Sequence, residues 1–268
     1  SAANVSTAAY GFLTMGAANL IRSFATPEHQ ARFLPSMKTG RFSGTMALTE
    51  PNQGSALADI RTRAVEQADG SYKLSGQKMY ISGGDHELTD NIIHMVLAKI
   101  DGAPAGDKGI SLFICPKFLV NDDGSIGERN DVQLAGLLHK MGNRNTTSTV
   151  LNFGEQGGAT AYLVGKPHHG LLCMFQMMNE ARIGVGMGAA VLAYQGYNYS
   201  LDYARERPQG RLVSNKDPAS EQVNIIQHPD VRRMLLAQKA YAEGAMALCL
   251  YGSQLFEDSK SLASQSEK

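Results

Sequence analysis

The period of the hydrophobic residues changes twice along the chain, and this change constrains the fold more than any other feature. Apolar side chains recur at helical spacing in residues 1–40, form short runs between turns in residues 43–165, and return to helical spacing in residues 170–268. Helices and strands have periods of about 3.6 and 2 residues. The sequence therefore predicts an α+β protein, with helices in 1–42, a β domain in 43–166 and further helices in 167–268.

The first helical part has a clear internal boundary. Thr26-Pro27-Glu28 combines an N-cap hydroxyl, a proline at the first helical position and an acid in the first turn, which is typical of a helix start. The helix that begins there carries Phe33 and Leu34, and we expect it to end at Thr39-Gly40.

The middle part is expected to form an antiparallel barrel or sandwich. Asp69-Gly70 is a hairpin turn signal between two short apolar runs. Further strand candidates are residues 46–49, 77–82, 92–99, 109–115, 148–153 and 160–164. The first of these ends in Thr49 and runs straight into Glu50-Pro51 and a turn of small residues. Such a turn can offer hydroxyls and backbone N–H groups to a polar or phosphorylated ligand, although any strand-ending turn has a similar composition.

Two long helices are expected in the last part, separated by a proline-rich loop. A helix that starts near Phe175 should stop at Arg207-Pro208, because proline cannot continue a helix. A second helix follows Pro229. Both helices carry apolar residues at intervals of seven, namely Met178, Val185, Leu192 and Tyr199, then Met234, Tyr241, Leu248 and Leu255. Long amphipathic helices of this kind are expected to pack antiparallel, as in a bundle.

Composition excludes several classes of function. The formal net charge is zero, so no overall field attracts nucleic acid or an anionic membrane. Cys115, Cys173 and Cys249 lie far apart in apolar surroundings, which favours free thiols in a reducing compartment and a cytoplasmic protein. The most apolar long window, residues 183–195, is too short to span a bilayer, and the first residues do not resemble a secretory leader.

Several motif matches are better explained by structure than by chemistry. Gly184 to Ala189 matches the dinucleotide-binding pattern GxGxxA, but helical sequence continues on both sides where a strand should precede it. Small residues that let two helices approach closely are the preferred explanation. His168-His169 and Asp85-His86-Glu87 lack the spacing of a metal site.

Three groups of residues leave two interpretations open. Arg205 and Arg207 could meet a pyrophosphate or could simply complement the dipole at a helix C-terminus. An arginine in an apolar helix needs a partner, so Arg182 is expected to meet either a carboxylate or a ligand. The methionines before it could shape an adaptable pocket or belong to the core; they are Met174, Met177 and Met178.

The order of the motifs resembles the acyl-CoA dehydrogenase family along the whole chain. After the first helices come MALTEPNQGS, KMYISGG, GISLFI, HKMGNRNTTSTVLNF, NEARIGVG, YARERPQGR and IIQHPDVRRML. The segments ISGGDHELTD and IIQHPDVRRML look most like the long bacterial branch, which includes the 3-methylmercaptopropionyl-CoA dehydrogenases. The resemblance implies the end of an N-terminal helical domain, a middle β domain and the start of a helical bundle, so we expect the chain to be part of a longer protein.

The resemblance implies that FAD lies in a crevice between the β domain and the bundle. The hydroxyls of Thr49 and Ser55 are expected to bond the polar edge or phosphates of the cofactor, Tyr80 to cover one face of its ring system, and Ser82 to donate near N5. The full set of expected cofactor-binding residues is Met46, Leu48, Thr49, Ser55, Tyr80, Ile81, Ser82, Arg207 and Gln227.

The activity implied by the resemblance is FAD-dependent α,β-dehydrogenation of an acyl-CoA, with electrons passed to an electron-transfer flavoprotein. Ser55, Asn179 and Arg182 are the expected substrate-binding residues, and a homodimer or homotetramer is the expected assembly. The catalytic glutamate of most members lies well past the second long helix, so we expect it beyond residue 268. A minority place it just before the arginine, but Ala181 stands there, and Glu180 is turned by about 100°.

Some features depart from the family pattern and leave alternatives open. Ala56 replaces the usual Asp after Ser55, the loop 212–226 is long, and Pro208-Gln209-Gly210 shortens the segment that meets the adenine end. The alternatives are an acyl-CoA oxidase or nitroalkane oxidase-like flavoenzyme, and a relative without flavin that acts as an interaction module. The equal numbers of acidic and basic residues after Ser200 argue against a nucleic-acid partner.

Overall fold

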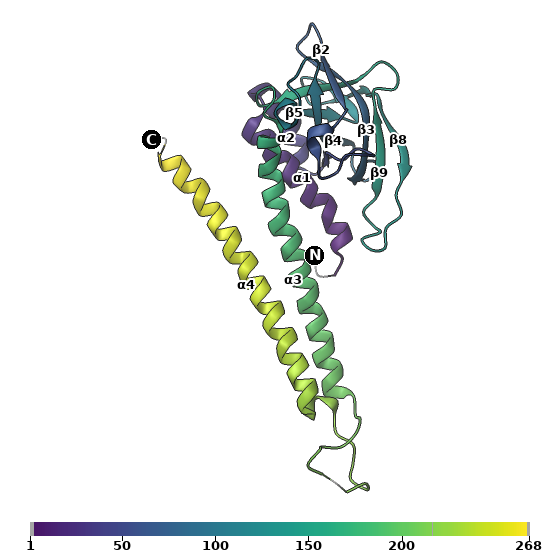
Figure 1. The fold of residues 1–268 in the computed structure, drawn as a ribbon, viewed down its shortest axis with the longest axis vertical. Helices are drawn as coiled ribbons and strands as arrows, with labels where there is room; N and C mark the ends of the chain where they lie inside the picture. Colours follow the sequence, from purple (N-terminus) through teal and green to yellow (C-terminus); the bar gives the residue numbers. More distant parts are fainter. Residues whose placement is uncertain (1–2, 216, 267–268) are drawn as a thin grey trace. The chain divides into compact units, whose positions relative to one another are not determined.

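The computed structural model describes residues 3–215 and 217–266, which belong to two compact units. The first unit comprises residues 4–181 and holds two helices and the whole β domain (Figure 1). The second unit contains Ala3 and the described residues from 182 onward, which form two long helical segments and the loop between them. Helix α3, Gly170–Glu206, begins in the first unit and ends in the second.

The two N-terminal helices begin where their capping residues predict. Helix α1, Val5–Phe24, starts after Asn4, whose side chain accepts a hydrogen bond from the backbone N–H of Thr7. Helix α2, Pro27–Lys38, starts after Thr26, whose hydroxyl accepts from the N–H of His29. Side-chain caps satisfy N–H groups that have no partner inside a helix. The predicted helix start at Thr26-Pro27 is therefore confirmed.

The β domain is a closed sheet with extra strands at its edges. Its strands are β1 (Phe42–Ala47), β2 (Arg63–Glu66), β3 (Tyr72–Ser82), β4 (Asn91–Ile100), β5 (Ile110–Pro116), β8 (Val132–Leu137), β9 (Ser148–Phe153) and β10 (Ala159–Val164). Along the sheet the order is β1-β4-β5-β10-β3-β9-β8, and β2 pairs with both β3 and β4. These pairings close β4, β5, β10, β3 and β2 into a ring, so the predicted barrel is confirmed.

The strand directions differ from the prediction in one respect. Most pairs are antiparallel, but β1 runs parallel to β4, with Phe42 opposite Asn91 and Ala47 opposite Val96. Strand β2 also runs parallel to the end of β4. The sequence signals concerned hairpins, which report only on neighbouring strands.

The short pair β6 (Phe118–Val120) and β7 (Ile126–Arg129), and strand β8, were not among the predicted strands.

Two hydrophobic clusters hold the first unit together. The larger one joins α1 and α2 to one face of the sheet and includes Leu20, Phe33 and Ile93, all fully buried. Met174 and Met177 at the start of α3 also belong to it, which favours the core interpretation for these two methionines. The smaller cluster fills the barrel and includes Leu74, Ile81 and Phe113. Complete removal of side chains this large from water is the main driving force for folding.

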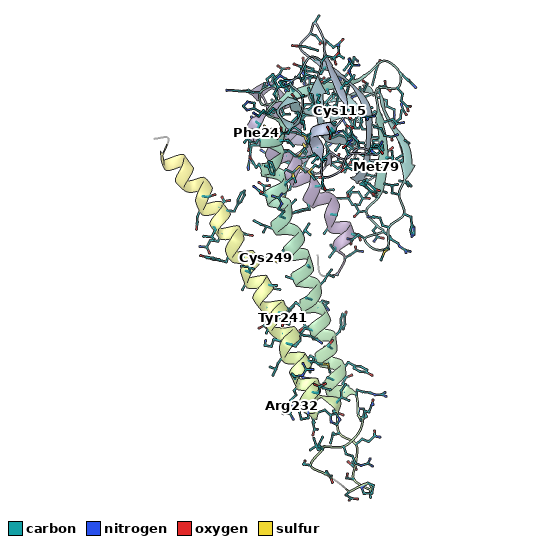
Figure 2. All side chains as sticks on the ribbon, viewed as in Figure 1. Phe24, Met79, Cys115, Arg232, Tyr241 and Cys249 are labelled. Carbon is teal, nitrogen blue, oxygen red and sulfur yellow. The ribbon has the colours of Figure 1, made fainter. Side chains whose placement is uncertain are left out.

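The helical unit packs along a different face from the one that the heptad spacing suggests. The expected face of α4, Pro229–Ser266, is exposed: Tyr241 and Leu248 are 78% and 69% exposed. Its buried residues lie one position later, at Leu235 and Ala242. A Cβ added at Gly186 of α3 would lie 3.5 Å from the sulfur of Cys249 on α4, an ordinary van der Waals contact, so the helices meet here without requiring a glycine. Figure 2 labels Cys249 on α4.

Helix α3 continues without interruption through Gly184 to Ala189. A dinucleotide-binding motif would need a strand before these residues, so the match to that motif is not supported. None of the described helices combines the length and apolar character needed to cross a membrane.

A buried histidine links the stability of the β domain to pH. His94 on β4 is fully buried, and its Nδ1 lies 2.8 Å from the Thr45 hydroxyl oxygen on β1. Burial lowers the pKa of His94 from 6.5 to about 3, and the charge of Asp85 only partly opposes this effect. Between these two values the unfolded chain takes up a proton that the folded chain does not bind. Stability must therefore fall as the pH drops through this window.

We predict that His94→Gln removes this acid sensitivity. Relative to the parent, the slope of the unfolding free energy against pH should decrease by about 1.4 kcal/mol per pH unit between pH 6 and pH 4. Urea unfolding at several pH values measures the slope. The matched control His139→Gln removes an exposed histidine and should leave the slope as in the parent. Equal slopes in H94Q and the parent would contradict the prediction.

Candidate functional site

The segment after β1 docks on β3 without forming a regular strand pair. Strand β1 ends at Ala47, and the carbonyl of Thr49 then accepts a hydrogen bond of 2.9 Å from the backbone N–H of Met79 on β3. Glu50 and Gln53 exchange two backbone hydrogen bonds, of 2.9 and 3.1 Å, which close a tight turn around Pro51. The turn therefore has a defined shape and a defined attachment to the sheet.

A buried ion pair lies beneath this turn. Lys78 is completely buried, and its Nζ lies 3.0 Å from Glu50 Oε1 and 3.0 Å from the Leu48 carbonyl oxygen. The Glu50 carboxylate also accepts from the N–H of Arg61 at 2.6 Å, and from the N–H and hydroxyl of Thr62 at 2.9 and 2.6 Å. Buried charges are tolerated only when they are paired and hydrogen-bonded in this way.

The surroundings shift the pKa values of both partners downward. Burial lowers the pKa of Lys78 to about 8, and the Glu50 carboxylate only partly opposes this effect. Burial by itself would raise the pKa of Glu50, but the charge of Lys78 and the hydrogen bonds from Thr62 and Arg61 together hold that pKa below its usual value. The carboxylate is therefore ionised at neutral pH and faces a protonated lysine.

The sequence analysis did not identify this pair. One signal was present, because the charged Lys78 lies within a predicted strand, directly before Met79, Tyr80 and Ile81. A second lies in Gly76, which has φ +153° and whose added Cβ would lie 2.8 Å from the Thr62 Cα. Only glycine lets Thr62 approach β3 closely enough to reach Glu50.

Two residues after Lys78, strand β3 is held in a strained conformation. The pairing of β3 with β9 shifts between Lys78 and Ile81, so a bulge interrupts the ladder at this point. Tyr80 lies in the bulge with φ +60°, a backbone conformation that residues other than glycine rarely adopt. The Tyr80 residue is 61% exposed. An exposed aromatic ring held by a strained backbone is typical of a binding site.

The structure brings the expected cofactor residues of the β domain to the turn and the bulge. The hydroxyls of Thr49, Ser55 and Ser82 have no hydrogen-bond partner within the described residues. Met46 and Leu48 are half-buried and pack against the larger cluster. Ile81 differs from these, because its side chain is 1% exposed and fills the barrel. The Ile81 backbone pairs with Thr149 on β9, whose hydroxyl donates to the Ile81 carbonyl at 3.0 Å.

The other expected residues lie on α3 and in the helical unit. The carbonyl of Arg207 accepts a hydrogen bond of 2.9 Å from the N–H of Ile225, which lies two residues before Gln227. Both side chains are exposed. Asn179 and Arg182 are exposed positions of α3 that have interactions of their own. Glu180 Oε2 accepts from the side-chain amide of Asn19 on α1 at 2.8 Å, so this carboxylate takes part in a contact between helices.

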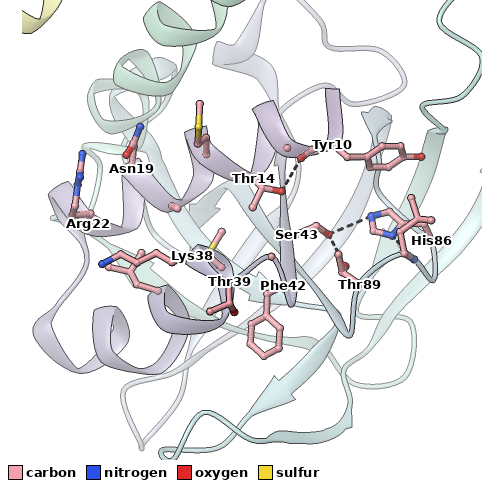
Figure 3. A pocket seen from close by; sticks show the side chains of 17 residues that line it. Tyr10, Thr14, Asn19, Arg22, Lys38, Thr39, Phe42, Ser43, His86 and Thr89 are labelled. Atoms are coloured by element: carbon pink, nitrogen blue, oxygen red, sulfur yellow. Dashed lines mark hydrogen bonds between the residues drawn. The ribbon is translucent and has the colours of Figure 1, made fainter. Parts of the chain in front are cut away.

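A separate cavity of about 650 Å³ lies between α1, α2 and the loop before β4 (Figure 3). It contains Ser43 and His86, whose Oγ and Nε2 are 3.2 Å apart. His86 Nδ1 accepts a hydrogen bond from the N–H of Leu88, so Nε2 carries the proton and donates to Ser43. Burial lowers the pKa of His86, and Lys117 adds to the effect. A histidine that donates to the serine cannot activate it as a nucleophile.

The turn and the bulge offer the kinds of groups that a flat, polar, aromatic ligand such as a flavin needs. The hydroxyls of Thr49, Ser55 and Ser82, which have no partner within the described residues, can donate to polar atoms, and the exposed Tyr80 ring can lie against an aromatic plane. No group of three or more His, Cys, Asp or Glu side chains that could hold a metal ion occurs in the described part of the chain.

Comparisons with known proteins point to one family. The family model for the acyl-CoA dehydrogenase middle domain matches residues 45–155. The 3-methylmercaptopropionyl-CoA dehydrogenase of Ruegeria pomeroyi is 44% identical over 89% of this chain, and a butyryl-CoA dehydrogenase of Syntrophomonas wolfei is 41% identical over 96% of it. The chain covers 40% and 43% of these relatives, so it spans about two fifths of their length.

A solved structure shares the fold. The butyryl-CoA dehydrogenase of Megasphaera elsdenii superposes with a TM-score of 0.73, and the match covers 92% of this chain and 58% of that one. At 23% sequence identity, this likeness concerns the fold alone.

We predict that glycine is more favourable than alanine at position 80, the reverse of the usual order in a strand. Tyr80→Gly relieves the strained φ, whereas Tyr80→Ala removes the ring and keeps the strain. We expect the glycine variant to be more stable by about 1 kcal/mol in thermal or urea unfolding.

The same two substitutions at Gln77, an exposed position of β3, serve as the control. There alanine should be the more stable residue by about 0.5–1 kcal/mol. If the alanine variant were more stable than the glycine variant at position 80 as well as at position 77, the bulge would not strain Tyr80.

Proposed function

Because this chain belongs to the acyl-CoA dehydrogenase family, we propose that it supplies the flavin-binding part of an enzyme that converts an acyl-CoA to the trans-2-enoyl-CoA. The observation that carries this proposal is the meeting of the Thr49 turn and the strained Tyr80 bulge on β3. Both lie within residues 45–155, the part that matches the middle-domain model. The proposed division of the chain into residues 1–42, 43–166 and 167–268 follows the same family pattern.

The proposed cofactor is FAD, which when bound accepts the hydride that leaves the β-carbon of the acyl group. Thr49 and Ser82 would orient its ring system through their hydroxyls, and Tyr80 would cover one face and exclude water. Ser55 lies in the exposed turn, where it can meet either the cofactor or the substrate. Arg207 and Gln227 are proposed to meet the phosphates and other polar parts of FAD, and Asn179 and Arg182 to face the acyl-CoA.

The catalytic base is proposed to lie beyond residue 268. A glutamate that removes the α-proton needs a dry pocket and free access to the substrate. Glu180 accepts a hydrogen bond from Asn19, which supports a role in the contact between α1 and α3. The relatives named above are longer than this chain, so the activity is proposed for the whole protein.

Further proposals concern the partners. An electron-transfer flavoprotein is the proposed acceptor, the assembly is proposed to be a homodimer or homotetramer, and the location is proposed to be the cytoplasm. Consumption of oxygen without an electron-transfer flavoprotein would favour an oxidase instead.

We predict that removal of either hydroxyl at the bulge or the turn weakens FAD binding. Thr49→Val and Ser82→Ala each remove one hydrogen bond, worth about 0.5–1.5 kcal/mol, so the dissociation constant should rise roughly two- to tenfold. Titration of flavin fluorescence measures it. Ser75→Ala, at an exposed position of β3, is the matched control and should bind as the parent does. Equal binding by all three variants would contradict these roles.

We also predict that residues 1–268 alone bind FAD and show no dehydrogenation of saturated acyl-CoAs. An artificial electron acceptor and thioesters of several chain lengths provide the assay. Rapid turnover that Glu180→Gln abolishes would place the base within this chain and overturn the prediction. A purified chain without visible flavin absorbance, even after incubation with FAD, would contradict the proposed function itself.

A further inference from the structure

The two segments expected to hold the flavin are distant in the sequence and meet at one buried lysine. The turn of residues 48–55 follows β1, and the bulge at Tyr80 lies within β3. Lys78 precedes the bulge by two residues, and its side chain reaches under the turn.

Two consecutive residues of β3 hold three consecutive residues of the turn. Lys78 Nζ donates to the Leu48 carbonyl and to the Glu50 carboxylate, each at 3.0 Å. Between them, the N–H of Met79 donates to the Thr49 carbonyl at 2.9 Å. These contacts place the Thr49 hydroxyl relative to the residue that follows Met79, which is the strained Tyr80.

Regular strand pairing does not extend to this point. The ladder between β1 and β4 ends with Ala47 opposite Val96. Beyond it, the turn is attached by the contacts from Lys78 and Met79 and by the Glu50 carboxylate, which accepts three hydrogen bonds from Arg61 and Thr62. Lys78 is thus the side chain that connects the turn to the strand carrying the bulge.

The charge of Lys78 is better explained by its effect on the position of the turn than by a contribution to the stability of the fold. A buried ion pair often contributes no more to stability than apolar residues of the same size, because both charges lose their hydration. An apolar side chain cannot donate to a carbonyl and a carboxylate at once, however, so it would fill the space without defining the position of the turn.

We propose that Lys78 is a positioning residue for the flavin, which fixes the Thr49 turn against the Tyr80 bulge through the Leu48 carbonyl and the Glu50 carboxylate. The part that concerns flavin rests on the proposed function. The part that concerns the attachment of the turn is independent of any ligand, and each part has its own measurement.

The first measurement is amide hydrogen exchange on the chain without flavin, comparing Lys78→Met with the parent. Methionine has similar length and lacks donors, while Glu50 keeps its three other hydrogen bonds. The amides of Met79 and Gln53 should exchange roughly tenfold faster or more, and those of β4 should be unchanged. Lys73→Met is the matched control, since Lys73 lies on the same strand and donates to Thr160 instead. Unchanged exchange at Met79 would overturn the attachment.

The second measurement is FAD binding, with the visible spectrum of the bound flavin as a readout of its surroundings. Lys78→Met should raise the dissociation constant roughly tenfold or more and shift the flavin absorbance bands, whereas Lys73→Met should do neither. Leu97→Ala, in the larger cluster, controls for loss of stability alone. Should K78M not fold, Lys78→Gln, whose amide is a shorter donor, takes its place with a smaller expected effect.

The outcomes separate the two proposals. Faster exchange at Met79 in K78M, together with a parent chain that binds no flavin, would support the attachment and contradict the proposed function. Tight flavin binding with an unchanged spectrum in K78M would overturn the positioning role and leave the proposed function standing. Equal weakening in K78M and L97A, at equal loss of stability, would also overturn the positioning role.

Discussion

The buried ion pair between Glu50 and Lys78 is the interaction on which the candidate site depends. Neither charge is tolerated in the interior without the other, and both use their remaining hydrogen-bonding capacity on backbone groups or on Thr62. The pair therefore requires three segments to be in place together: the turn after β1, the segment before β2 and the middle of β3. A site assembled in this way has a defined shape before any ligand arrives.

The closed ring of strands makes this arrangement possible. Strand β3 is long enough to pair with β2 and β10 at its start and with β9 at its end. Where it leaves the ring, Gly76 admits Thr62, and the following bulge displaces Tyr80 from the ladder. The strained backbone of Tyr80 cannot relax, because it is held on both sides. Lys78 and Ile81 both pair with β9, and the Ile81 side chain is buried.

The prediction from sequence succeeded where local chemistry decides the structure. Caps and prolines indicated the start of α2 at Pro27, and alternation indicated the principal strands. It was less accurate where partners are distant. The parallel pairing of β1 with β4 joins residues about fifty positions apart, and no local signal reports it. The heptad residue Tyr241 is exposed while its neighbour Ala242 is buried, because the spacing of apolar residues indicates that a helix has an apolar face but not which neighbour covers it.

The sequence by itself determined the kinds of elements, their order and the family resemblance, because capping, period and motif order are local properties of the chain. It also supplied the candidate residues Thr49, Tyr80 and Ser82. Only the tertiary structure decided that Ile81 points into the barrel and that Lys78 lies beneath the turn. The physical reason is that a side chain's environment depends on which distant segments surround it, and burial of a charge is possible only where those segments bring it a partner.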